Sequence, residues 1–445
     1  MKFFINLSLY LLFASIFLLE GFLAEGNAGS GLHLIPSKVS YMIEILSGAI
    51  ALYSFIILAF SKDFSIRLVY VFFFFALVMN ALIGIAFNTV PSGAVFAGMR
   101  RYFAFMPLFF LPLVYKFSEK EIKTHLTIIL FFGLLQLPLT VYQRFFLFRG
   151  VGTGDCITGT LSISSILSIY LICSIAILTA FYIKQKIPLS LFIILSIILF
   201  IPTTLNETKG TLVLFPIAIM ITILFGRGAI ISFKKIFLIV SAVTVIILVF
   251  IPIYNYLSPH ETDIVNFFKG KGEKTHSVEG YLFKGVSEEE LGETELGRFD
   301  ALLFPFKILS KEPFSLAVGL GIGNVNSSGI KLFEGEHTEY DLYGANSITA
   351  ASLIWETGLL GLFLHGLFLF LVLKDAIAIR DVDTIIGNLA AGWIAVTIIL
   401  GLSFFYKNIF HIKVISYLFW YFSGHIAAMR TRHAATMHSN IPHQS

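Results

Sequence analysis

Five basic side chains fall at the ends of long apolar segments: Arg100, Arg101, Arg144, Arg149 and Lys209. A sixth, Arg298, lies in a long polar segment, just before a short apolar stretch. Charge placed among apolar side chains is costly, and where it persists in a membrane it usually serves a function. Cations that converge form a receptor for an anionic group such as a pyrophosphate, because they bind phosphate oxygens strongly. Long basic side chains also extend along apolar surface to reach water, and that alternative stays open.

Two further residues have side chains suited to proton transfer or charge pairing. His337 lies in an acidic stretch, and a histidine can act as a general base near neutral pH. His260 and His276 compete for this role but lie farther from the point where the chain becomes apolar again. Glu356 falls within an apolar segment, where a carboxylate needs a cationic partner. An exposed, inert histidine and a structural ion pair are the alternative interpretations.

The composition indicates that these residues are positioned by membrane helices. The chain is 57% hydrophobic and 13% charged, whereas soluble domains carry about 25% charged residues. A water-soluble core cannot bury so much apolar surface, but a lipid bilayer can. The two cysteines, Cys156 and Cys173, provide no disulfide framework or metal site. We therefore expect no metal ion or cofactor and no nucleic-acid partner.

A spanning helix needs roughly 20 mainly apolar residues, and about twelve segments meet this condition. They cover residues 4–24, 38–60, 67–87, 94–115, 124–147, 161–183, 188–203, 209–226, 236–256, 346–373, 384–405 and 411–429. The first segment is alternatively a secretory signal peptide, although it carries Glu20. The expected fold is an all-α polytopic membrane protein with a large extracytoplasmic loop between the ninth and tenth helices.

The distribution of Lys and Arg predicts the orientation, because short cytoplasmic connections are enriched in both. The basic residues lie in alternate connections: Lys2; Lys62 and Arg67; Lys116, Lys120 and Lys123; Lys184 and Lys186; Arg227, Lys234 and Lys235; Lys374 and Arg380; Arg430 and Arg432. The chain then divides into nine helices (1–257), an extracytoplasmic loop (258–345), three helices (346–429) and a cytoplasmic tail (430–445). Both termini are predicted in the cytoplasm of a bacterial cell, with the protein in the inner membrane.

The second half of the loop contains its most informative sequence features. Arg298 precedes the mainly apolar stretch 301–309, which is typical of a short amphipathic helix on a membrane surface. Alternating glycines follow at Gly319, Gly321 and Gly323. Such glycines permit either a compact turn that re-enters the bundle or a phosphate cradle of exposed amides. Both interpretations of the glycines stay open.

The order of these features resembles the O-antigen ligase and O-antigen polymerase superfamily. The matching residues are Arg298, then Pro313, then Gly319, Gly321 and Gly323, and then the Glu-x-Gly-x-x-Gly motif at 356–361. About twelve helices with a large outer loop before the last three also fit this family. Thr208-Lys209-Gly210 is similar to the family's outer Ser-Arg-Gly helix start, with Lys in place of Arg. Ala345-Asn346 stands where the family has His-Asn, which leaves His337 as the candidate base.

The resemblance implies a metal-independent, inverting glycosyltransferase. Its donor would be an undecaprenyl-pyrophosphate-linked glycan and its acceptor a glycan or a lipid, with a polymerase favoured over a ligase. Catalytic roles would fall to His337, Arg298 and Glu356. The pyrophosphate would be bound by a second group of cations, namely Arg100, Arg101, Arg144 and Lys209. Other membrane proteins of polysaccharide assembly are expected as partners.

A transporter or flippase of an anionic solute or polysaccharide is the alternative. About twelve helices suit a secondary carrier. The two halves of the sequence show no internal repeat and no matching pair of broken helices, and the loop is long for a simple connection. These features favour the enzyme over the carrier.

Overall fold

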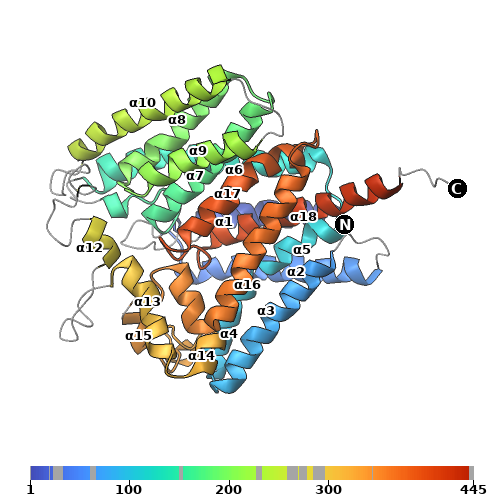
Figure 1. Ribbon diagram of the computed structural model, residues 1–445, viewed down its shortest axis with the longest axis vertical. Coiled ribbons are helices and arrows are strands. Elements are labelled where there is room, and N and C mark those ends of the chain that lie inside the picture. The colour runs from blue at the N-terminus through green and yellow to red at the C-terminus, as the bar shows by residue number, and fades with distance from the viewer. Residues whose placement is uncertain are drawn as a thin grey trace.

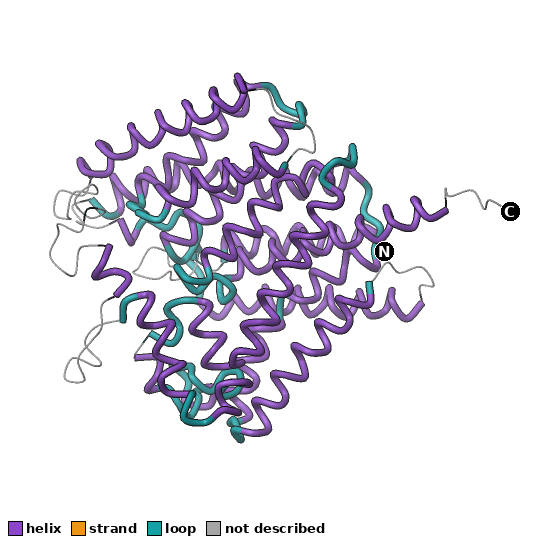
Figure 2. The backbone as a smooth tube through the Cα atoms, in the orientation of Figure 1, coloured by secondary structure: helices purple, strands orange, loops and turns teal. Residues whose placement is uncertain are grey.

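The computed structural model describes residues 2–19, 21–23, 34–60, 67–149, 154–226, 233–257, 269, 278–283, 296–342 and 344–439. Within these ranges every regular element is a helix, and the tube in Figure 2 shows helices joined by short loops without a strand. The prediction of an all-α fold is therefore confirmed for the described residues. His260 and His276, along with most of the first half of the predicted loop, lie outside them.

The longer helices lie side by side in one bundle (Figure 1). They are α1 (Lys2–Leu18), α2 (Met42–Phe60), α3 (Leu68–Phe87), α4 (Ser92–Phe103), α5 (Met106–Val114), α6 (Glu119–Tyr142), α7 (Ser164–Ile183), α8 (Leu189–Leu205), α9 (Thr211–Phe225), α10 (Phe233–Leu257), α16 (Thr349–Ile379), α17 (Ile385–Ser403) and α18 (Lys413–Ser439). Four shorter ones follow α10: α12 (Val278–Phe283), α13 (Arg298–Leu309), α14 (Pro313–Val318) and α15 (Glu339–Leu342). Helix α13 begins at Arg298, as the sequence predicts for the short amphipathic helix.

Among the described residues, six helices are long and apolar enough to cross a membrane, and a seventh span is counted if α4 and α5 are taken together. The six are α2, α3, α6, α7, α16 and α17. Helices α1, α8 and α9 and the end of α10 are apolar but shorter. The described helices thus indicate a membrane protein, while the arrangement of about twelve spans stays a prediction.

Helices α7 and α17 form the most completely buried part of the bundle. Around them the core is rich in aromatic rings: Trp393 stacks on Phe419, and Trp420 stacks on Phe368. This stacking holds α16, α17 and α18 together, because these rings come from all three helices. The helices that carry the candidate site are therefore fixed to each other by their inner faces.

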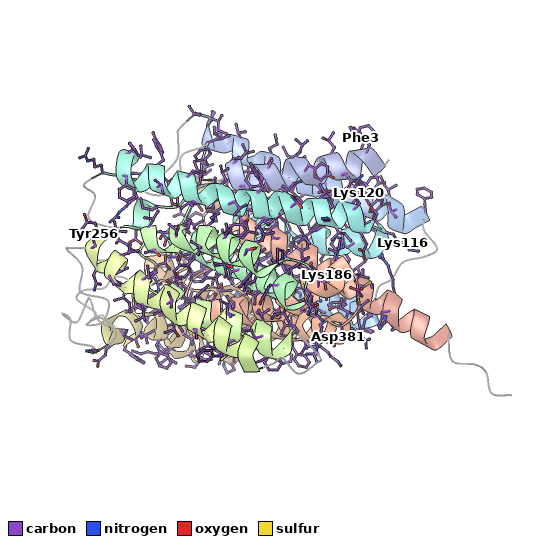
Figure 3. All side chains as sticks on the ribbon, turned by 90° about the horizontal axis from the view of Figure 1, so that it is seen from above. Phe3, Lys116, Lys120, Lys186, Tyr256 and Asp381 are labelled. Carbon is purple, nitrogen blue, oxygen red and sulfur yellow. The ribbon has the colours of Figure 1, made fainter. Side chains whose placement is uncertain are left out.

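Several of the basic connections that the sequence identified lie at one end of the bundle. Lys184 and Lys186 pair with the carboxylates of Asp381 and Asp383 at 3.0 and 2.8 Å, which brings the α7–α8 and α16–α17 connections together. Figure 3 shows Lys116, Lys120, Lys186 and Asp381 toward the same end, and Tyr256 at the other. These basic connections alternate along the sequence with less basic ones, and in the fold they share one end.

Candidate functional site

A polar cavity of about 560 Å³ opens among the start of α2, the junction of α4 and α5, the α17–α18 connection and the segment 326–346. Its polar and charged lining consists of Glu44, Arg100, Arg101, Asn326, Ser327, Asp341, Asn346, Lys407, Asn408, His411, Lys413 and Ser416. These side chains come from four regions that are far apart in the sequence. The cavity is therefore a product of the tertiary fold.

Positive charge exceeds negative charge in this lining. The cations are Arg100, Arg101, Lys407 and Lys413, and the carboxylates are Glu44 and Asp341. Lys413 Nζ lies 3.2 Å from Glu44 Oε1, and the Arg100 guanidinium lies 5.1 Å from the centre of the Tyr41 ring. The lining residues alone carry four positive and two negative charges, so the cavity favours an anionic ligand.

A break between α4 and α5 places the two arginines at the cavity. The two helices meet at an angle of 45°, and Pro107 at the start of α5 has no N–H with which to continue the helical hydrogen bonds. The sequence predicted one unbroken helix over 94–115 with Arg100 and Arg101 in its first turns. Instead they lie in the last turn of α4, beside the break, and line the cavity.

Behind Arg101 lies a buried polar network centred on Glu356. The Glu356 side chain is 1% exposed, and its Oε1 lies 3.9 Å from the Arg101 guanidinium. Asn326 joins the two residues, because it donates to Glu356 and accepts from Arg101. Asn346 also donates to Asn326 Oδ1, at 2.8 Å. The network fixes Arg101 at the cavity wall, and it gives Glu356 the cationic partner that the sequence predicts for it.

The glycine-rich segment closes against this network and leaves no amide cradle facing the cavity. Gly319, Gly321 and Gly323 all have positive φ (78°, 90° and 83°), which residues with a side chain seldom adopt. The amides of Leu320 and Gly321 donate to the Trp355 and Glu356 carbonyls at 2.7 and 3.1 Å. Those amides are used inside the fold, so the geometry favours the compact re-entrant turn over the phosphate cradle.

Helix α16 needs these donors because it is interrupted at Gly358. This residue has φ 66° and ψ −170° inside an otherwise helical run, so carbonyls just before it lack their usual helical partners. Asn80 donates to one of them, the Thr357 carbonyl, at 2.9 Å. A side chain at Gly358 would place Cβ 2.3 Å from the Ala317 carbonyl oxygen. The broken helix and the glycine-rich turn are therefore one interlocked unit.

Among the lining residues that the sequence analysis missed are Lys407, His411 and Lys413. They lie in the short connection between α17 and α18 and at the first position of α18. Lys407 and Lys413 depart from the alternation of basic connections, because they flank a connection predicted on the outer side. That departure is the signal that could have identified them.

Arg144 does not contribute to the cavity. Its guanidinium lies 2.6 Å from Glu207 Oε1, with side-chain exposures of 8% and 4%, and it also donates to the Leu257 carbonyl. Glu207 in turn accepts from the amide of Gly154 at 3.0 Å. Arg144 is thus neutralised inside the bundle, where it joins the end of α6 to the ends of α8 and α10.

Arg298 and Lys209 lie beside the α17–α18 connection, outside the cavity lining. Arg298 Nε donates to the Tyr281 hydroxyl at 3.3 Å, and the Tyr281 ring lies 6.5 Å from that of Tyr406, next to Lys407. Gly210, which follows Lys209, packs so closely on the Tyr406 ring that a Cβ would lie 2.9 Å from it. Burial raises the pKa of Tyr406. The two predicted cations therefore lie in the neighbourhood of Tyr406, outside the cavity lining.

His337 and Arg149 are not brought to the cavity either. The His337 side chain is 36% exposed, lies 3.3 Å from Glu339 Oε1, and stacks near the Tyr340 ring. Arg149 is exposed at the end of the segment that follows α6. Of the predicted site residues, the structure groups Arg100, Arg101 and Glu356 and separates the others from them.

The described residues contain no group of three or more His, Cys, Asp or Glu side chains that could hold a metal ion. No protein-family model matches the chain, and no curated protein sequence matches it significantly.

Proposed function

We propose that this protein is a membrane glycosyltransferase that binds a lipid-linked glycan through its pyrophosphate and transfers the glycan to an acceptor hydroxyl. The observation that carries the proposal is the cavity, with four cations against two carboxylates and a volume suited to a small anionic head group. The sequence resemblance supplies the reaction class. The fold supplies the convergence of charges on which such a reaction depends.

The reaction assigned to this site is displacement at the anomeric carbon. The acceptor oxygen bonds to that carbon as the bond to the pyrophosphate oxygen breaks, so the leaving pyrophosphate takes the electron pair. Arg100, Arg101, Lys407 and Lys413 offset the negative charge that builds on it, because preorganised cations stabilise charge formed in a transition state. The acceptor proton passes to a base at the cavity. Asp341 and Glu44 are the carboxylates lining it, and the geometry does not support His337.

The proposal places the cavity on the extracytoplasmic side of a bacterial inner membrane, with about twelve spans and both termini cytoplasmic. Helix α16 begins beside the cavity after Asn346 and ends near Arg380, at the basic end of the bundle. Helix α17 returns from that end to Lys407. The cavity and the basic connections therefore lie toward opposite ends, and the positive-inside rule assigns the basic end to the cytoplasm.

The test uses the full chain in detergent or liposomes. Binding of inorganic pyrophosphate is measured for Arg100→Gln, Lys407→Gln and Lys413→Gln, with Lys120→Gln as a control that removes one exposed charge at the other end. Each cavity variant should weaken binding about tenfold, as expected for one charge-assisted contact, and the control should not. With a lipid-linked donor, glycosidic bond formation should fall in the same order. Equal affinity in all four variants refutes the site.

Transport of an anionic solute is the second candidate, and the two helix breaks favour it. The α4–α5 break and the interruption of α16 at Gly358 meet near the cavity through the contact of Arg101 with Glu356. Discontinuous helices at a substrate site are typical of secondary transporters. Sequence analysis showed no such pair. Liposomes distinguish the two candidates: solute uptake without a new glycosidic bond supports the transporter, and bond formation supports the enzyme.

A further inference from the structure

His411 occupies the part of the cavity wall formed by the α17–α18 connection. Its ring lines the cavity and meets the Tyr102 ring edge-on, with centroids 5.5 Å apart. The side-chain amide nitrogen of Asn408, three residues earlier, lies 2.8 Å from His411 Nδ1. The other ring nitrogen, Nε2, has no hydrogen-bond partner among the described residues and is not among their buried unpaired atoms. Nε2 is therefore the polar atom that His411 presents to the cavity.

The backbone fixes which way the Asn408 amide points. Its Nδ2 also donates to the Asn346 carbonyl oxygen, at 3.2 Å. Turning the amide over would place Oδ1 against that carbonyl, and two acceptors cannot form a hydrogen bond. Nδ2 must therefore face both Asn346 and His411. Since an amide nitrogen only donates, His411 Nδ1 must accept, and the proton of the neutral ring resides on Nε2.

The surroundings keep this ring neutral. Burial lowers the pKa of His411 well below its ordinary value, and the positive charge of Arg101 acts in the same direction. Lys407 and Lys413 flank it on its own connection, and the Glu44 carboxylate on α2 is engaged by Lys413. A protonated ring would also direct its Nδ1–H at the Asn408 amide nitrogen, which cannot accept it.

We propose that His411 is a neutral hydrogen-bond donor that binds an oxygen of the anion in the cavity through Nε2–H. It acts as a specificity-determining residue and not as the base, because its proton-accepting nitrogen is occupied by Asn408. The cations supply attraction in all directions, whereas a single directed N–H selects a ligand with an acceptor oxygen at one position. This inference deepens the proposed function and rests on it.

Three variants and one spectroscopic measurement test the inference on the full chain in detergent, with inorganic pyrophosphate as the probe. His411→Ala should weaken binding about tenfold, the loss expected for one hydrogen bond to a charged acceptor. His411→Gln should restore most of it, because the Gln amide places an N–H near the position of Nε2. Thermal unfolding of each variant checks the fold. Equal losses in His411→Ala and His411→Gln overturn the inference.

The pH dependence separates a neutral donor from a cation. The affinity ratio of wild type to His411→Ala should stay constant from pH 8 to pH 6, since a lowered pKa leaves the ring neutral throughout; using the ratio cancels the titration of pyrophosphate itself. Asn408→Asp puts a carboxylate against Nδ1 and raises the His411 pKa. The pyrophosphate affinity of this variant, divided by that of wild type at the same pH, should therefore be higher at pH 6 than at pH 8. A wild-type ratio that rises as pH falls refutes neutrality.

Nitrogen NMR of histidine-labelled protein gives a readout that requires no ligand. The signal lost in His411→Ala should show the neutral tautomer protonated at Nε2 at pH 7. A protonated ring, or a proton on Nδ1, contradicts the inference. The cation variants distinguish failure of the proposed function from failure of the role of His411. If Lys407→Gln and Arg100→Gln leave pyrophosphate binding unchanged, the proposed function fails; if they weaken it and His411→Ala does not, only the role of His411 fails.

Discussion

Replacing Arg101 should destabilise the protein through Glu356, and replacing Glu356 as well should recover part of the loss. The Glu356 carboxylate is almost fully buried, with the Arg101 guanidinium 3.9 Å away and Asn326 bonded to both. Arg101→Met keeps a long side chain and removes the charge, which leaves a buried anion without its counter-ion. Glu356→Gln in the same background removes that anion and keeps a hydrogen-bonding partner for Asn326.

The magnitude follows from the distance and the exposure. Two unit charges at this separation attract by about 4 kcal/mol at an effective dielectric constant of about 20. Arg101 is 27% exposed, so water screens part of that attraction, and we expect a coupling of about 2 kcal/mol. Arg101→Met alone should cost about 3 kcal/mol, because breaking a buried pair strands a charge. The double variant should cost about 2 kcal/mol less than the sum of the single variants.

The assay is denaturant unfolding of the full chain in mixed micelles, with all four members of the cycle. The exposed Lys186–Asp383 pair serves as the matched control, since Lys186→Met with Asp383→Asn should show weaker coupling. Glu356→Gln should also raise pyrophosphate affinity, because it frees the charge of Arg101. A coupling within about 0.5 kcal/mol of zero, the error of such cycles, refutes the interpretation of Glu356 as the counter-ion of Arg101.

Three further predictions separate the cavity from the rest of the fold. Arg144→Met should cost about 3–5 kcal/mol by stranding the buried Glu207 carboxylate, yet leave the pyrophosphate affinity of the folded fraction unchanged, as measured by unfolding and titration. Gly358→Ala should cost about 3 kcal/mol because of its positive φ and the Ala317 carbonyl, whereas Gly366→Ala in the same helix meets no atom within 4 Å and should be neutral or stabilising in thermal unfolding. His337→Ala should change stability by less than about 0.5 kcal/mol and leave pyrophosphate affinity unchanged; a large loss in binding would restore His337 to the site.

Local sequence pattern was enough to predict the all-helical class and the short helix that starts at Arg298. It also predicted that basic connections lie at the same end of the bundle. Each depends on residues close together in the chain. Apolar run length determines whether a helix can span a membrane, and charge in short connections determines its orientation. Lys184 and Lys186 illustrate this, because their positions between two apolar segments indicated which end they occupy before Asp381 and Asp383 were known as partners.

The identity of charge partners could not be predicted in this way, and Arg144 shows why. In the sequence it resembles Arg101, as a basic residue in an apolar context. The structure gives both a carboxylate partner, but at different depths: Arg144 is 8% exposed and lies 2.6 Å from Glu207, whereas Arg101 is 27% exposed and lies 3.9 Å from Glu356. Only the second arrangement leaves a guanidinium available to a ligand. The difference depends on contacts more than 60 residues apart in sequence, which no local pattern encodes.

The sequence contains the residue at each helix break near the cavity, but whether such a residue breaks a helix depends on the groups that face it. Pro107 lacks an amide hydrogen and Gly358 lacks a side chain, and either residue is tolerated in many unbroken membrane helices. A break becomes stable only where other groups satisfy the freed carbonyls. Ser47 donates to the Ala104 carbonyl at the first break, and Asn80 and the glycine-rich turn do so at the second. The donors come from α2, α3 and the segment after α14. Helix α2 lines the cavity, and the other two elements hold the part of α16 that carries Glu356, the partner of Arg101. A variant that removes one donor, such as Asn80→Leu, should therefore disturb ligand binding and stability together.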